Sequence, residues 1–176
     1  MFDFDSIKDG IYEWINSVSG LEAVRADQNA PKRNNSFFTY KLNSILQIGE
    51  DYLSEPDDNG LANVCGSRDF TCQILGFGDG IMEKTEALRS SLQIPDILDA
   101  LGAKKIVVFD RSGIEDLTAL DESEFEARSS LDVFMRSEMI TTGVDIGAIK
   151  IMNGIATFIQ PEKPDITRNY SIDSTI

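Results

Sequence analysis

Two long apolar-alternating segments joined by a turn sequence constrain the fold of this chain more than any other feature. From Ser36 to Leu53, apolar residues alternate with polar or smaller neighbours at the period of a β-strand. This alternating set is Phe38, Tyr40, Leu42, Leu46 and Ile48. A second strand pattern runs from Leu61 to about Phe77, and Glu-Pro-Asp-Asn-type turn residues fill positions 55–60 between the two. Asn-Gly at the end of that turn is a strong hairpin signal, because both central positions need positive φ. The pattern predicts one long β-hairpin whose distal part projects.

A helical apolar stripe precedes the hairpin. Apolar residues recur every three to four positions over residues 5–18, which predicts an amphipathic helix. The stripe consists of Phe4, Ile7, Ile11, Trp14, Ile15 and Val18. Asp3, Asp5 or Ser6 is expected to cap the start of this helix, and Gly20 is expected to end it.

The remaining segments set the fold class. Two helices are expected after the hairpin, one at 81–92 with Asp79 as its N-cap and a shorter one from Pro95 to Gly102. Further strands are predicted at 21–26, 104–109, 124–139 and 149–159, with a polar loop at 27–35 and an acidic loop at 110–122. This order predicts an α+β fold, with a mainly antiparallel (mixed) β-sheet, a long β-hairpin and two to three helices packed on one side.

Chain length and the C-terminal sequence predict the domain organisation. We expect residues 1–160 to form one domain, since the length suits a single core. Residues 161–176 contain two prolines and a weak alternation, so we expect an extended C-terminal segment that is ordered only by a partner.

Composition excludes several classes of function. The chain has 16 basic and 30 acidic residues, a formal net charge of −14, and no histidine. Such an acidic chain should repel phosphate backbones, which argues against tight nucleic-acid binding. The lack of histidine removes Ser-His-Asp triads, Cys-His dyads and imidazole metal ligands. No run of 18 apolar residues occurs, so no membrane-spanning segment and no membrane partner are predicted.

No sequence motif favours a cofactor, metal or catalytic site. Gly-Phe-Gly-Asp-Gly at 76–80 matches neither phosphate-loop pattern, and is better explained as a tight turn. Residues 55–60 resemble a calcium loop only in part, because the twelfth position is glycine. Cys65 and Cys72 are seven positions apart in one strand and should face opposite sides, so we expect two reduced thiols. Glu124 and Glu126 share a strand face, where pairing with Arg128 or Arg136 is expected.

Charge is distributed unevenly along the chain. Positions 50–60 contain five acidic and no basic residues, whereas positions 21–43 carry a net charge of +2. Complementary patches of this kind suit a head-to-tail assembly in which an acidic arm of one subunit meets a basic loop of its neighbour. An ordinary solvated surface accounts for the same pattern equally well. The candidate interface residues are Glu50, Asp51, Glu55, Asp57, Asp58, Arg25, Lys32, Arg33, Arg128 and Arg136.

An ordered set of segments resembles one family of viral proteins. The segments are QNAP (28–31), SILQIGEDYLSEPDDNG (44–60), RDFTCQILGFGD (68–79), LRSSLQ (88–93), IEDLTALDESEFEARSSLDV (114–133) and IGAIKI (146–151). Together they resemble the neck or tail terminator proteins of tailed bacteriophages and prophages, best known from contractile-tailed phages. The resemblance covers roughly residues 7–155.

This resemblance implies a structural role in the virion. Family members are α+β subunits that form a hexameric ring at the top of the tail, end tail-tube polymerisation and join the tail to head-completion or adaptor proteins. The implied partners are other copies of the chain, the tail tube, the sheath protein as a further candidate, and genomic DNA that passes through the channel without sequence-specific binding. Assembly in the host cytoplasm, no cofactor and no enzymatic activity are expected.

Two alternatives from other classes remain open at this point. A small acidic hydrolase would use the region of Glu124 and Glu126, although the chain lacks histidine and metal-ligand spacing. An acidic DNA mimic or regulatory binding module would be a compact monomer or dimer with acidic groups at phosphate-like spacing.

Overall fold

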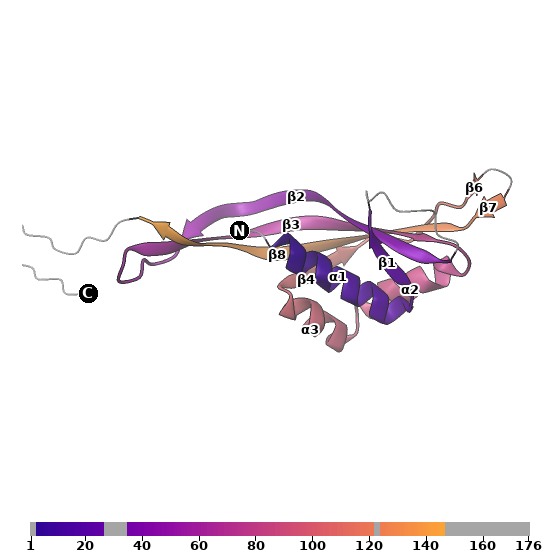
Figure 1. Cartoon of the computed structure of the whole chain (residues 1–176), viewed down its shortest axis with the longest axis horizontal. Coiled ribbons are helices and arrows are strands. Elements are labelled where there is room, and N and C mark those ends of the chain that lie inside the picture. The colour runs from indigo at the N-terminus through magenta and orange to yellow at the C-terminus, as the bar shows by residue number, and fades with distance from the viewer. Residues whose placement is uncertain (1–2, 27–34, 122–123, 147–176) are drawn as a thin grey trace, which may run out of the picture. The chain divides into compact units, whose positions relative to one another are not determined.

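The computed structural model describes residues 3–26, 35–121 and 124–146 of the chain. Its elements in chain order are α1 (Phe4–Ser19), β1 (Glu22–Arg25), β2 (Phe37–Leu53), β3 (Leu61–Phe77), α2 (Ile81–Ser91), α3 (Pro95–Ala103), β4 (Ile106–Arg111), β5 (Glu115–Asp116), β6 (Ala119–Asp121), β7 (Glu124–Glu126) and β8 (Arg128–Asp145). Helices α1, α2 and α3 lie on one side of the sheet (Figure 1). The predicted α+β class is therefore confirmed.

The main sheet is six-stranded and mixed. Its strand order is β1-β2-β3-β8-β4, and β5 adds to β8. Strand β1 is parallel to β2, with Glu22 opposite Phe37 and Arg25 opposite Tyr40, whereas β4 and β5 are antiparallel to β8. Strands β6 and β7 form a separate two-stranded sheet. The order leaves β2 and β4 at or near the two outer edges.

The chain divides into two compact units. The first comprises Met1–Tyr52 and Cys65–Ile140, and the second comprises Leu53–Val64 and Thr141–Ile176. The first unit contains α1, α2, α3 and the hydrophobic core cluster. The predicted single domain over 1–160 and the predicted projection of the distal hairpin stay predictions.

The helical stripe of α1 forms one side of the core, as predicted. Ile7, Ile11, Trp14 and Ile15 are at most 3% exposed. They belong to one cluster with the buried face of the sheet, which contributes Phe38, Tyr40, Phe70, Cys72, Ile74, Leu131, Val133 and Met135. The indole Nε1 of Trp14 donates a hydrogen bond to Ser91 Oγ at 2.9 Å. Its only polar atom is therefore paired, which allows this large side chain to be buried at low cost.

The ends of α1 follow the sequence expectation, but the start of α2 does not. The Asp3 carboxylate accepts from the Ser6 amide at 3.0 Å, and Gly20 ends α1 with a left-handed φ of 66°. The prediction of Asp79 as the N-cap of α2 was wrong. Gly80 occupies that position with φ of 68°, and no side chain caps the helix. A side-chain cap needs an extended backbone at the N-cap, which the left-handed turn at Gly80 excludes.

Four other boundaries differ from the sequence prediction. The predicted acidic loop at 110–122 contains the end of β4, all of β5 and all of β6, which pairs with β7. The long alternating strand begins at Arg128 and not at 124, because residues 124–126 form β7, which pairs with β6 in a separate sheet. Helix α3 continues through Gly102 to Ala103, and β4 begins at Ile106. The short strands β5 and β7 consist mainly of charged residues, so apolar alternation does not predict them.

The hairpin turn in the second unit is built differently from the prediction. Only Gly60 is left-handed, with φ of 79°, so the expectation of two positive φ angles at Asn-Gly was wrong. The Gly60 amide donates to the Asp57 carbonyl at 2.8 Å. The Asp57 carboxylate accepts from the amides of Asn59 and Leu61, both at 2.9 Å. These bonds lower the pKa of Asp57, the one from Leu61 most. An aspartate side chain thus organises the turn.

Several predictions lie outside the described residues. They are the loop at 27–34 with Lys32 and Arg33, the strand at 149–159 and the C-terminal segment 161–176.

Candidate interface surfaces

Strand β2 changes character along its length. Phe38 and Tyr40 are buried, whereas from Ser44 to Leu53 every side chain except Asp51 is exposed. The apolar members of this exposed part are Ile45 (41% exposed), Leu46 (60%), Ile48 (39%), Tyr52 (62%) and Leu53 (53%). We call residues 44–53 the exposed half of β2. Exposed apolar groups gathered on one strand are typical of a surface that contacts another protein.

The exposed half of β2 also lies at an edge of the sheet. Its outer neighbour in the strand order is β1, whose register with β2 covers only Phe37 to Tyr40. Among the described residues, no strand pairs with the outer side of β2 beyond that point. At the other edge, β4 carries exposed Val107 and Phe109. Both edges can therefore accept a strand or side chains from another molecule.

Asp51, a predicted interface residue, is engaged inside the chain. Arg68 on β3 donates to its two carboxylate oxygens at 2.7 and 2.6 Å. The side chains of Arg68 and Asp51 are 13% and 21% exposed. The hydrogen bond from Arg68 lowers the pKa of Asp51, so the carboxylate stays ionised. This ion pair stabilises the packing of the exposed half of β2 beside β3.

Arg136 and Arg128 are also engaged within the chain. Arg136 donates to both oxygens of Asp69 and lies over the Phe109 ring, 5.6 Å from its centroid. Arg128 donates to Glu126 and lies 5.6 Å from the Phe77 ring. The expected pairing of Glu126 with an arginine is thus present.

Arg25 lies beside a pocket that Lys8 and Lys41 also line. Its Nη2 is 3.1 Å from Asp9 Oδ1, and its Nε donates to the Tyr40 hydroxyl at 3.4 Å. The bond with Tyr40 raises the pKa of Arg25, and burial raises the pKa of Tyr40. A pocket of about 420 Å³ opens beside them. Its lining is Phe4, Lys8, Arg25, Ala26, Tyr40, Lys41 and Leu42, which we call the basic pocket.

The basic pocket includes two cations that the sequence analysis did not single out. Lys8 lies one helical turn after Phe4, and its Nζ is 5.6 Å from the centre of that ring. Lys41 follows buried Tyr40 and is exposed. The available signal was the alternation of β2, which places Lys41 opposite the core-facing side, and the i, i+4 spacing of Phe4 and Lys8.

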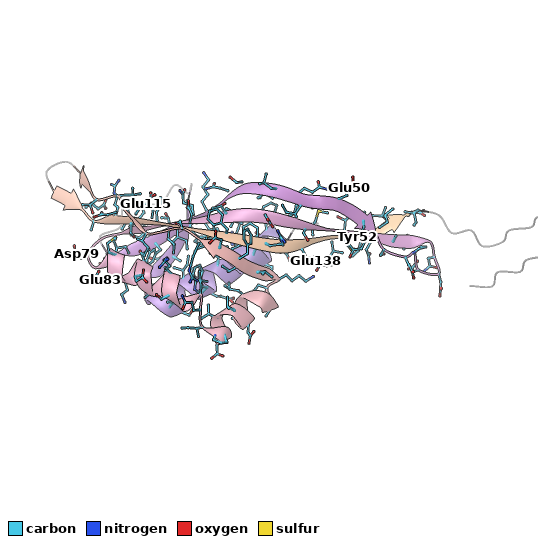
Figure 2. The ribbon with its side chains drawn as sticks, turned by 180° about the vertical axis from the view of Figure 1, so that it is seen from behind. Glu50, Tyr52, Asp79, Glu83, Glu115 and Glu138 are labelled. Carbon is cyan, nitrogen blue, oxygen red and sulfur yellow. The ribbon has the colours of Figure 1, made fainter. Side chains whose placement is uncertain are left out.

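The predicted acidic residues remain exposed at the other end of β2 and in the turn. Glu50 lies on β2 and Tyr52 follows it along the strand (Figure 2). Glu55 and Asp58 are exposed, whereas Asp57 is held by the turn amides. Glu50, Glu55 and Asp58 are therefore the acidic candidates best placed to meet a partner.

The described residues offer no evident reactive centre. They contain no group of three or more Cys, Asp or Glu side chains arranged to hold a metal ion. Cys65 is half-buried and Cys72 is fully buried, and both are free thiols. Burial raises the pKa of Cys72 far above its usual range, which disfavours the reactive thiolate. Within the described part, no helix has the length and apolar character to cross a membrane.

The described part of the chain is an α+β protein with exposed apolar strand edges that suit contacts with other proteins. Comparison with known families identifies its class. The family described as phage neck terminator protein matches residues 5–162, and the chain belongs to this family. It is a structural family of the phage neck, so the suspected resemblance is confirmed and the chain is a virion component that associates with other head and tail proteins. A search of curated proteins found no match.

Proposed function

We propose that this chain forms a homohexameric ring at the top of the phage tail. The ring ends polymerisation of the tail tube, joins the tail to the head-completion or adaptor proteins, and leaves a channel for DNA. The observation that carries this proposal is the exposed apolar half of β2, in a chain that belongs to the phage neck terminator family.

The two edges of the sheet support a cyclic assembly. The outer side of β2 and the strand β4 are different surfaces, so a contact between them in neighbouring copies is head-to-tail. Such contacts close into a ring when the rotation between copies divides a full turn. The exposed apolar residues on both strands would be buried by this contact.

The charge of the chain suits a ring through which DNA passes. Six copies would carry six times −14 formal charges. An acidic channel repels phosphates, so DNA could move through it without condensing on the wall. Tail tube and adaptor proteins are the proposed axial partners, the sheath protein is a further candidate, and assembly takes place in the host cytoplasm.

The alternative classes receive less support from the structure. Glu126, half of the carboxylate pair that a hydrolase would use, is bonded to Arg128. A DNA mimic needs no exposed apolar strand, whereas the exposed half of β2 carries five large apolar side chains.

Light scattering after size-exclusion chromatography, with electron microscopy of the same fractions, tests the proposal. The wild-type chain is expected to form rings or to cap isolated tail tubes. Leu46→Ser with Tyr52→Ser should weaken both activities, while Met82→Ser on α2, a matched exposed apolar residue, should not. A strictly monomeric wild-type protein that neither caps tubes nor binds tails would overturn the proposal.

A further inference from the structure

One face of the main sheet carries no helix of the described part of the chain. Helices α1, α2 and α3 all lie on the opposite side (Figure 1). Along β8, the side chains of Leu131, Val133 and Met135 are fully buried in the core cluster. Successive side chains of a strand point to opposite faces, so Asp132 and Phe134 lie on the other side of the sheet, which we call the helix-free face.

The helix-free face contains a carboxylate that lacks a partner within its own chain. One oxygen of Asp132, Oδ1, is buried, and no described residue donates a hydrogen bond to it. The side chain as a whole is only partly buried, so the carboxylate stays within reach of another molecule. Covering a carboxylate oxygen without a donor costs free energy, and a molecule that brings a donor to this carboxylate offsets that cost.

Another aspartate on the same face does have a cationic partner. Phe70 is buried in the core, so Asp69, its neighbour on β3, points to the helix-free face. Arg136 donates to both oxygens of Asp69, and this bond lowers the pKa of that carboxyl. The pKa of Asp132 is raised instead, by burial and then by the charge of Glu115. Within the described residues, Asp132 therefore lacks the cation that Asp69 has.

The surroundings of Asp132 define what can bind there. Glu115 on β5 is exposed and lies opposite Ser130, two positions before Asp132, so it shares the helix-free face and adds a second negative charge. Phe134 follows two positions after Asp132, and its ring centroid is 6.4 Å from that of Phe109, which is 53% exposed. A fitting ligand therefore carries a positive charge beside apolar groups. Ligands that carry phosphate, including nucleic acid, would be repelled.

The charge of the chain points to a different protein as the source of that cation. The chain has 30 acidic and 16 basic residues, so an acidic site on one copy repels the rest of another copy. Most cations of the described residues already lie within 4.0 Å of a carboxylate of their own chain, as Lys104 does with Glu13. The other head and tail proteins with which this family associates are the remaining source.

We propose that the helix-free face around Asp132 binds a basic segment of another head or tail protein, whose arginine or lysine side chain pairs with the Asp132 carboxylate. This inference rests on the proposed function, because it assigns a surface to a partner above or below the ring. The apolar side chains of that segment pack on Phe134 and Phe109 and exclude water from the charge pair. Glu115 adds attraction at the border of the contact.

Binding of the full-length protein to purified phage tails and heads tests this surface. Both particles are taken from a phage that lacks this chain, and cosedimentation of the labelled protein gives an apparent Kd for each. Asp132→Asn keeps the shape of the side chain and removes its charge, so it should raise the Kd for one of the two particles by about tenfold or more. Glu115→Lys places a like charge beside the incoming cation and should weaken the same binding.

Matched controls separate this site from a general effect of charge. Asp99→Asn on α3 and Glu83→Lys on α2 make the same changes at exposed positions of the helices, and Figure 2 shows Glu83 apart from Glu115. Both controls should bind like the wild-type protein. Asp132→Asn should melt at the wild-type temperature or above it, because it removes an unpaired charge. A lower melting temperature would show that this carboxylate supports the fold, which contradicts the proposal.

The outcomes also separate this inference from the proposed function. If the wild-type chain forms rings or binds either particle, and Asp132→Asn behaves like Asp99→Asn, the site is wrong and the proposed function stands. If Asp132→Asn prevents ring formation by the isolated chain, a second copy occupies the helix-free face and the assigned partner is wrong. If the wild-type chain forms no rings and binds neither tails nor heads, both proposals fail.

Discussion

The two halves of β2 are one strand by sequence pattern but are held in place by different forces. Around Phe38 and Tyr40, alternation points side chains into a core covered by α1. Beyond Ser44 the alternation continues, yet no described helix covers it and the side chains are exposed. There, Arg68 binds Asp51, and in the turn the Asp57 carboxylate binds backbone amides. Alternation therefore reports strand conformation, and burial must come from a second element or a second molecule.

The largest expected effect on stability lies in the core that α1 forms with the buried half of β2. Trp14→Ala removes a buried indole from α1 and leaves a cavity, so it should lower the free energy of unfolding by about 3–5 kcal/mol. Urea unfolding of the variant measures this loss. Emission of the wild-type protein, whose only tryptophan is Trp14, should be blue-shifted, and strongly red-shifted emission would contradict the burial.

A smaller effect is expected at the hairpin turn. Gly60→Ala places a Cβ on a residue with φ of 79°, which should cost about 1–2 kcal/mol. The neighbouring Asn59→Ala keeps an ordinary backbone and should cost much less. Hydrogen exchange of the Leu61 amide compares the two variants. If the Leu61 amide loses the same protection in both variants, Asn59 and Gly60 both need positive φ, as the sequence predicted.

The aspartates that are bonded outside the hydrophobic core should make the stability of the folded protein sensitive to acid. The pKa values of Asp51, Asp57 and Asp69 are lowered in the folded protein from the ordinary value of 3.8. Their contribution to stability is therefore present above pH 3.8 and is lost as the pH falls through the lowered folded-state values. Melting temperature should fall below about pH 4, and Arg68→Gln should flatten that dependence. An unchanged slope in the variant would contradict a role for the Asp51 pair.

The smallest effect on subunit stability is expected in the exposed half of β2. Leu46→Ser should change the free energy of unfolding by no more than about 0.5 kcal/mol, because the side chain is 60% exposed. Chemical denaturation at a concentration below assembly provides the measurement. A loss comparable to that of Trp14→Ala would mean that the subunit itself covers this residue.

Much of this fold could be predicted from local sequence patterns. The apolar stripe of α1, its cap at Asp3 and the bounds of β2 and β3 depend on neighbouring residues, and the sequence contains those neighbours. Pairings between distant segments were harder to predict. The parallel register of β1 with β2 depends on where the chain returns after the helix, which no local pattern encodes.

The candidate site shows the same division. Glu50, Glu55 and Asp58 were found from charge alone and are exposed. The engagement of Asp51 by Arg68 was not predicted, because it requires the register of β2 against β3 over a separation of 17 residues. Lys8 was missed because it lines the same pocket as Lys41 only once α1 has been placed against the sheet.

The backbone of β2 has a consequence for how far assembly can proceed. Ser44 and Gly49 adopt left-handed φ angles of 53° and 69° within the strand. Such irregularities disturb the straight ladder of amides and carbonyls that strand-by-strand stacking requires. An uncovered apolar edge with this shape can join a partner of matching contour, yet it is a poor template for a fibril. Under the proposed function, a chain that ends the growth of the tail tube is thereby kept from starting a second polymer.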